Sequence, residues 1–261
     1  MLWPALTVVF KTFVGEQGVG LDSLLRALSG TYQQSFILST QLSATTALLG
    51  GVLGFVLALL VSSLPAKSRL RSAAEAWSAV ASQMGGIPLA FAFLAVLGTQ
   101  GIATRILNEF LGIDIIEAGF SLSNFWGWVL VYLYFQIPLM FLVVSPAISA
   151  LKPSWYEGAQ SLGASKSLYY RKIAIPILAP VIITGLLLLF VNSFSAYATV
   201  YALSSAGGQL VPLQIRFILQ GNVITGEKDL GYALVTVTMA VLGIAVLLIS
   251  WLQKLFSRWS A

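Results

Sequence analysis

The chain has 261 residues, of which 58% are hydrophobic and 9% are charged, and its mean hydropathy is +0.90. Soluble domains carry roughly 25% charged residues, so this composition predicts an integral membrane protein. The net charge is +5, and the chain has no cysteine and no histidine, which excludes disulfides, cysteine nucleophiles and the usual zinc and haem ligand sets.

Five apolar runs are each long enough to cross a bilayer, which takes about 20 helical residues. We predict spans at 36–62, 73–98, 123–150, 177–202 and 231–256. An opening run at 1–14 is too short to assign, so five or six spans are expected. This run has no basic segment before it and does not resemble a cleavable signal peptide.

The first predicted span carries small residues on one helical stripe. Their spacing is 4, 3, 4 and 4, and they are Ser39, Ser43, Thr46, Gly50 and Gly54. Small residues allow helices to approach closely, so the stripe predicts either a packing face or a pore face.

Charge distribution gives the orientation. Nine basic residues fall in 64–72, 151–176 and the C-terminal tail, against three in the opposite loops. By the positive-inside bias, those three segments are cytoplasmic. Glu75 is expected to pair with Arg71 at the mouth of its helix. No carboxylate falls at mid-depth, which argues against a proton- or sodium-coupled carrier.

Glycine and proline interrupt two spans. The segment MGGIPLAF holds Gly85, Gly86 and Pro88, and the segment YFQIPLM holds Gln136 and Pro138. A proline leaves the carbonyl four residues earlier without its helical partner. Each segment therefore predicts a kink, either static or acting as a gate.

The most polar long stretch is residues 151–176. Ser154 and Glu157 fit a capping box at the start of a short helix, and Gly163 fits the glycine that ends it. Ser165 fits the cap of a second short helix that ends near Arg171, after which Pro176 opens the next span. These two short helices form an elbow on which apolar side chains are expected near water, and this predicts a docking surface. The side chains are Trp155, Tyr156, Leu162, Leu168 and Tyr169.

The pattern E-G-A-x3-G-x9-I-A-I-P in this stretch resembles the EAA loop, E-A-A-x3-G-x9-I-x-L-P, of ABC-importer permease subunits. Gly158 and Ile175 replace the alanine and leucine of that pattern. The resemblance covers roughly residues 35–256. The segment FSAYATVYALSSAGGQLVPLQIRFILQG is most similar to the polyamine, aminoethylphosphonate, thiamine and ferric iron branch.

The resemblance implies an all-α, polytopic type I importer permease (MetI-like), a bundle of five or six transmembrane helices with a cytoplasmic coupling-helix elbow. We expect an N-terminal region 1–35, a permease domain 36–256 that includes the coupling loop 151–176, and a cytoplasmic tail 257–261. It also implies these ATPase-coupling residues: Ser154, Trp155, Tyr156, Glu157, Gly158, Ala159, Leu162, Gly163, Leu168, Arg171, Ile173 and Pro176.

In that family the elbow docks in a cleft of a cytoplasmic ATPase, and closure of the ATPase dimer switches the spans between inward- and outward-open states. The resemblance implies a catalytically silent subunit of the bacterial cytoplasmic (inner) membrane, which forms half of a translocation pathway among membrane lipids. Its implied partners are a second permease subunit, homologous or identical, two copies of the ABC ATPase and an extracytoplasmic substrate-binding protein. No nucleic acid is expected.

ATP and Mg are expected in the partner ATPase, and this chain is expected to hold no cofactor and no metal. The chain lacks G-x4-G-K-[ST], and we interpret SSAGGQL at 204–210 as a coincidental likeness to the ABC signature. The implied cargo is a small polar solute such as spermidine or putrescine, with aminoethylphosphonate, thiamine or ferric iron as alternatives.

The fourth predicted span carries polar residues that avoid lipid. Asn192, Ser195 and Thr199 recur at i, i+3 and i+7, and Tyr197 and Tyr201 lie on another side. The translocation-pathway candidates are Gln136, Asn192, Ser195 and Tyr197. They include no carboxylate, so we expect a weak polar corridor, with recognition by the binding protein.

The outer segment 209–221 is interpreted as a re-entrant scoop, a binding-protein surface or a plain loop. Two other function classes compete with the importer subunit. A self-contained carrier or channel predicts intramembrane charges and an inverted repeat. A membrane enzyme would be left with serine or tyrosine chemistry, for which the sequence has no motif.

Overall fold

The computed structural model describes residues 2–15, 18–65, 67–204, 209–220 and 228–257. The predicted tail beyond Ser257 and residues 205–208 of SSAGGQL therefore fall outside the described residues. The described residues fold into helices and one short hairpin, formed by β1 (Val14–Gly15) and β2 (Gly18–Val19). The predicted all-α class is confirmed.

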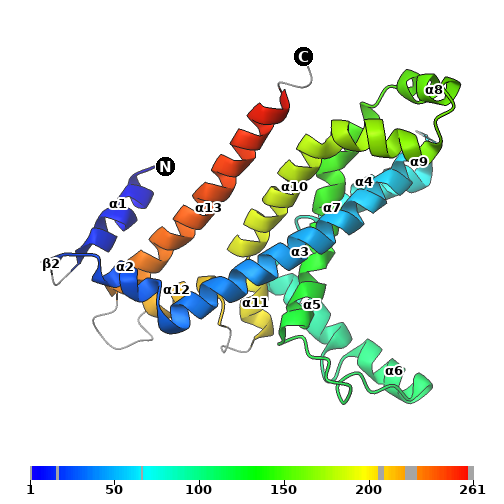
Figure 1. Ribbon diagram of the computed structural model, residues 1–261. Coiled ribbons are helices and arrows are strands. Elements are labelled where there is room, and N and C mark those ends of the chain that lie inside the picture. The colour runs from blue at the N-terminus through cyan, green and yellow to red at the C-terminus, as the bar shows by residue number, and fades with distance from the viewer. Residues whose placement is uncertain (1, 16–17, 66, 205–208, 221–227, 258–261) are drawn as a thin grey trace. The chain divides into compact units, whose positions relative to one another are not determined.

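The helices in chain order, drawn in Figure 1, are α1 (Leu2–Phe13), α2 (Asp22–Ala27), α3 (Gly30–Ser62), α4 (Arg69–Ala81), α5 (Gly86–Leu97), α6 (Ile102–Leu111), α7 (Phe125–Ser149), α8 (Pro153–Ser161), α9 (Lys166–Tyr169), the π-helical turn η1 (Tyr170–Ala174), α10 (Ile175–Ser195), α11 (Ala198–Leu203), α12 (Val211–Leu219) and α13 (Lys228–Ser257).

These elements divide into two compact units. The first unit contains Met1–Ser43, Gly86–Trp128 and Phe194–Leu247. The second contains Ala44–Gly85, Val129–Ser193 and Leu248–Ala261. The long helices α3, α7, α10 and α13 each contribute residues to both units.

Five helical segments in the described part of the chain are long and apolar enough to span a membrane. They are Gly30–Ser62, Gly86–Leu111, Phe125–Ser149, Lys166–Ser195 and Lys228–Lys254. Four of them overlap the predicted spans, although the span predicted at 177–202 ends at Ser195, and the 12-residue α1 is not among them. The predicted span 73–98 is wrong, because α4 ends at Ala81 and a new helix begins at Gly86.

The break before α5 depends on glycine rather than on proline. Gly86 has φ +75°, a left-handed conformation in which side chains with a β-carbon are strained. Its N–H donates a hydrogen bond of 2.8 Å to Thr199 Oγ1. Pro88 lies in the first turn of α5, where its missing N–H costs little. The predicted interruption at Gly85 and Gly86 is therefore confirmed, but Pro88 does not kink a continuous helix.

The second unit is held together by close packing of α3 against α7. A β-carbon added at Gly50 would lie 2.7 Å from Gln136 Cβ, and one added at Gly54 would lie 2.6 Å from Met140 Cβ. Thr46 Oγ1 lies 2.9 Å from Ser193 Oγ. This half of the small-residue stripe is therefore a packing face, as the first of the two interpretations predicted.

In the first unit, Ser39 of the same small-residue stripe also faces a neighbouring helix. Ser39 Oγ accepts a hydrogen bond of 3.0 Å from the N–H of Val211, at the start of α12. In Figure 1, α1 runs beside α13, where Thr12 Oγ1 and Thr236 Oγ1 lie 2.7 Å apart. A separate apolar cluster joins α2, α12 and α13 through Ala27, Ile218 and Leu234.

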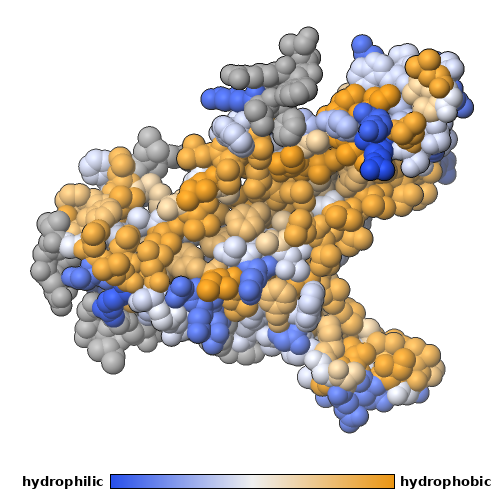
Figure 2. Space-filling model, viewed as in Figure 1, coloured by the Kyte–Doolittle hydropathy of each residue, from blue (hydrophilic) through white to orange (hydrophobic). Residues whose placement is uncertain are grey.

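Large apolar side chains remain exposed on the long helices, as a lipid-facing surface requires. Leu60, Leu247 and Trp251 are each at least 60% exposed. Figure 2 shows hydrophobic residues over most of the visible face, with hydrophilic ones near α8 and α9 and on α6. The chain is a multi-pass membrane protein, which confirms the prediction from composition.

Candidate functional site

The elbow between α8 and α9 has a defined geometry because Gly163 ends α8. Gly163 has φ +81°, and its N–H donates a hydrogen bond of 2.9 Å to the Gln160 carbonyl. The N–H of Ala164 donates one of 3.0 Å to the Ala159 carbonyl. These two bonds form a Schellman motif, which satisfies carbonyls at the helix end. The predicted role of Gly163 as the terminating glycine is confirmed.

The start of α8 differs from the prediction. The helix begins at Pro153 with Lys152 as its cap residue, and no side chain caps it. Ser154 is therefore inside the first turn, and the predicted capping box with Glu157 is wrong. Proline is favoured at the first helical position, because its φ angle is already helical and its absent N–H would have had no partner.

The second helix of the elbow does not end near Arg171. Ser165 caps it as predicted, since Leu168 N–H donates a hydrogen bond of 3.3 Å to Ser165 Oγ. The helical path then continues from α9 through η1 into α10, with Pro176 as the second residue of α10. Pro176 therefore does not open a separate helix, and the elbow connects directly to a membrane span.

The apolar side chains of the elbow divide into two groups. Leu162 is 90% exposed, Leu168 46% and Trp155 38%, as a docking surface requires. Tyr169 is buried, and its ring packs edge-on against Tyr156 with centroids 5.1 Å apart. The prediction of an exposed Tyr169 is wrong, because the two tyrosines bind α8 to α9.

The remaining coupling-loop residues follow the same division. Ala159 and Ile173 belong to the cluster around Tyr169, whereas Glu157, Gly158 and Arg171 are exposed. Among the residues that the structure describes, no cation forms an ion pair with Glu157. The elbow therefore presents a free carboxylate beside exposed apolar side chains.

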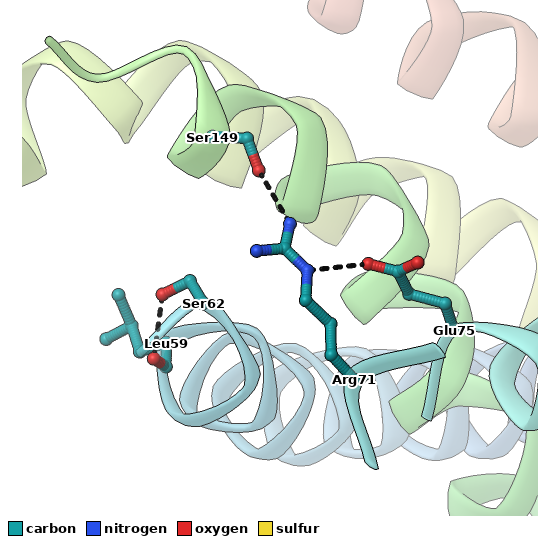
Figure 3. Close-up of polar contacts among 5 residues, drawn as sticks. All are labelled: Leu59, Ser62, Arg71, Glu75 and Ser149. Carbon is teal, nitrogen blue, oxygen red and sulfur yellow. Dashed lines mark hydrogen bonds and ion pairs between the residues drawn. The ribbon is translucent and has the colours of Figure 1, made fainter. Parts of the chain in front are cut away.

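A groove of about 480 Å³ lies next to the elbow, within the same unit. Arg71 Nε donates to Glu75 Oε1 at 3.0 Å, which confirms the predicted pair, and Arg71 Nη2 reaches Ser149 Oγ at 3.5 Å (Figure 3). Lys152 and Lys166 also line the groove. Its charged lining is thus entirely cationic among the described residues.

The predicted pathway residues occupy different surroundings. Gln136 is fully buried in the second unit, where its Nε2 donates a hydrogen bond of 2.9 Å to the Leu189 carbonyl. Asn192 is half-buried in that unit. Ser195 and Tyr197 belong to the first unit, and α10 ends at Ser195. The predicted helix through residue 202 is therefore interrupted before α11.

The first unit contains an aromatic and cationic cluster that the sequence did not identify. Tyr197 and Tyr201 stack with centroids 5.6 Å apart, and the Arg216 guanidinium carbon lies 3.8 Å from the Tyr201 centroid. Arg216 donates to the Tyr197 hydroxyl and, through Nε, to Gln220 Oε1 at 2.8 Å. Arg216 and Tyr197 line a cavity of about 350 Å³. A lone arginine in an otherwise uncharged helix was the available signal.

Comparison with known proteins adds a family assignment to this geometry. A sequence profile described as "Binding-protein-dependent transport system inner membrane component" matches residues 50–260. A probable sulfate transport system permease protein of Chlorella vulgaris is 25% identical over 186 residues, which are 70% of this chain and 66% of that protein. The spermidine/putrescine transport system permease protein PotC of Haemophilus influenzae is 28% identical over 165 residues, which are 59% of this chain and 62% of that protein. The chain thus spans less than two thirds of either relative.

A solved structure has the same fold across nearly the whole chain. It is a bacterial ABC transporter described as involved in the import of the acidic polysaccharide alginate. A chain of that transporter aligns with a TM-score of 0.74 at 17% identity, over 99% of this chain and 90% of the other. The same transporter in complex with an alginate pentasaccharide-bound periplasmic protein gives a TM-score of 0.72. The likeness therefore shows a shared fold with a chain of that transporter.

Proposed function

The chain belongs to the family of binding-protein-dependent transport system inner membrane components, the permease subunits of ABC importers, and we propose that its α8–α9 elbow docks a cytoplasmic ATPase. The observation that carries this proposal is the Gly163 Schellman turn, which fixes exposed Glu157 and Leu162 at one end of a span. A rigid surface with an unpaired carboxylate and exposed apolar groups fits a protein partner.

The continuous helical path supplies the coupling. Because α9 runs through η1 into α10 without an end, a displacement of the elbow acts on a membrane span directly. Packed helices shift between discrete arrangements rather than deforming gradually. In this proposal the ATPase binds ATP and Mg, and this chain positions and moves helices without performing catalysis.

The complete importer would contain further subunits. We propose a second permease subunit, two ATPase copies and an extracytoplasmic binding protein, assembled in a bacterial cytoplasmic membrane. The solved complex of a similar fold with a periplasmic protein supports the last of these. The domain bounds 36–256, with the loop 151–176 facing the cytoplasm, remain part of this proposal.

The absence of native cysteine allows a direct test of the elbow. We expect Leu162→Cys to react with a membrane-impermeant maleimide in inside-out vesicles but not in intact cells, because Leu162 is 90% exposed on a cytoplasmic loop. Co-expression of the cognate ATPase should reduce the labelling of this cysteine, because the docked ATPase would cover it. Mass shift on a gel measures the labelling.

Phe110→Cys is the matched control for this experiment. Phe110 is 80% exposed in the last turn of α6, at the outer end of the candidate span Gly86–Leu111, so its labelling should occur in intact cells and should be unchanged by the ATPase. Labelling of Leu162→Cys from outside, or labelling that the ATPase does not reduce, would contradict the docking proposal.

For the cargo, we propose a small polar solute, and the relatives support two opposite charges. The likeness to PotC supports spermidine or putrescine, and the likeness to sulfate permeases supports an oxyanion. Arg216 favours the anion, because no described carboxylate neutralises it and it covers the Tyr201 face that would otherwise attract a cation. An anionic cargo is therefore the leading candidate.

The charge of Arg216 can be separated from its packing. We expect Arg216→Gln to reduce uptake by about tenfold, because a charged hydrogen bond contributes about 1.5 kcal/mol or more, and Arg216→Lys to retain most uptake. Uptake would be measured in proteoliposomes with the cognate binding protein, using sulfate and putrescine as probes. Equal loss in both variants would assign Arg216 a packing role, and saturable putrescine uptake would contradict an anionic cargo.

A further inference from the structure

We propose that the groove beside the elbow binds the phosphate of an anionic phospholipid headgroup from the cytoplasmic leaflet. The groove holds about 480 Å³, and its three charged lining residues are Arg71, Lys152 and Lys166. Among the described residues no carboxylate lines it, and Glu75 pairs with one edge of Arg71 only. A phosphate group would therefore meet uncompensated positive charge.

The position of the groove places it at headgroup depth. Ser62 and Ser149 are the last residues of two candidate spans, Lys166 is the first residue of a third, and all three line the groove. These ends lie on the side that the basic residues mark as cytoplasmic. Headgroups of the inner leaflet carry negative charge at this depth, and each nearby lysine or arginine strengthens their binding.

Several donors in the groove are available to an anion. Lys166 has no ion pair among the described residues, and the Lys152 ammonium lies 5.8 Å from the centroid of the Trp155 ring. Ser149 Oγ accepts from Arg71, which leaves its hydroxyl hydrogen available to an anion. Ser62 and Ser63 donate to carbonyls of their own helix and are therefore occupied.

The walls suit the apolar part of a lipid. Ile148, Leu151 and Tyr170 line the same groove as the cations. A free phosphate ion would gain nothing from these side chains, whereas the glycerol and the first methylene groups of a phospholipid would bury apolar surface against them. The combination favours a lipid over an inorganic anion. This assignment does not depend on ATPase docking.

The proposal is tested by native mass spectrometry of the full-length chain in its assembled transporter, released from nanodiscs containing phosphatidylglycerol and phosphatidylcholine. We expect selective retention of phosphatidylglycerol, reduced roughly thirtyfold in the double variant Lys152→Gln, Lys166→Gln. The matched control is Lys67→Gln with Arg69→Gln, which removes two exposed cations outside the groove and should retain the lipid. Lys152→Arg with Lys166→Arg should also retain it.

Three results would overturn the proposal. The first is equal retention of the two lipids by the unaltered protein. The second is undiminished phosphatidylglycerol on the Lys152→Gln, Lys166→Gln variant when that variant elutes as a single monodisperse species. The third is displacement of the lipid by excess inorganic phosphate, which would identify a site for a free anion instead.

Discussion

Replacing Gly163 with proline is expected to abolish transport while leaving the amount of membrane protein unchanged. Proline fixes φ near −65°, whereas Gly163 has φ +81°, and the substitution also removes the N–H that bonds Gln160. The cost is about 3 kcal/mol or more, which lowers the population of the native elbow roughly 100-fold. Substrate uptake and co-purification of the ATPase measure the effect.

Gly158→Ala provides the matched control for that substitution. Both glycines have open space where a β-carbon would lie, but only Gly163 has a positive φ. Alanine should stabilise α8 by up to about 1 kcal/mol, so uptake should be retained. Normal uptake by Gly163→Pro, or an equal loss in both variants, would show that the turn is not required for coupling.

Gly54→Leu is expected to destabilise the second unit by roughly 2 kcal/mol. A β-carbon at Gly54 would lie 2.5 Å from the Ile137 carbonyl oxygen and 2.6 Å from Met140 Cβ, so backbone must move before any further atom is added. Overpacking of this kind costs roughly 3 kcal/mol, which exceeds the gain of about 1 kcal/mol in helix propensity. Thermal melting in detergent, followed by size-exclusion chromatography, measures the loss.

Gly243→Leu makes the same chemical change where there is room for it. Gly243 is exposed on α13, and nothing lies within 4 Å of the added β-carbon. An apolar side chain on a lipid-facing position is favourable, so this variant should melt at or above the temperature of the unaltered protein. A Gly54→Leu protein as stable as Gly243→Leu would mean that α3 and α7 do not pack as described.

Sequence patterns predicted the long spans because a bilayer imposes a length and an apolar composition that are visible without tertiary information. They were wrong at 73–98 because hydropathy averages over a window and does not register a single left-handed glycine. Pro88 was assigned a kink since its position within a helix was unknown. The structure places it in a first turn, where proline is harmless.

The elbow was predictable in part because its terminating glycine and its serine cap act locally. Gly163 and Ser165 act through hydrogen bonds to residues three positions away, Gln160 and Leu168, and such local rules are readable from sequence. Tyr169 was placed wrongly because its burial depends on Tyr156, thirteen residues earlier and in a different helix. The Arg216 cluster and the cationic groove also join separate helices, so spacing alone could not reveal them.

The hydrogen bond from Gly86 to Thr199 has a consequence for chimeric permeases. One donor at the gap preceding α5 is satisfied by an acceptor on α11, the helix that follows the gap after Ser195. A graft that replaces only one of these two segments with that of a relative would leave the part-buried Gly86 amide without its acceptor. Residues 86–90 and 196–203, which belong to the same unit, should therefore be exchanged together in a chimera.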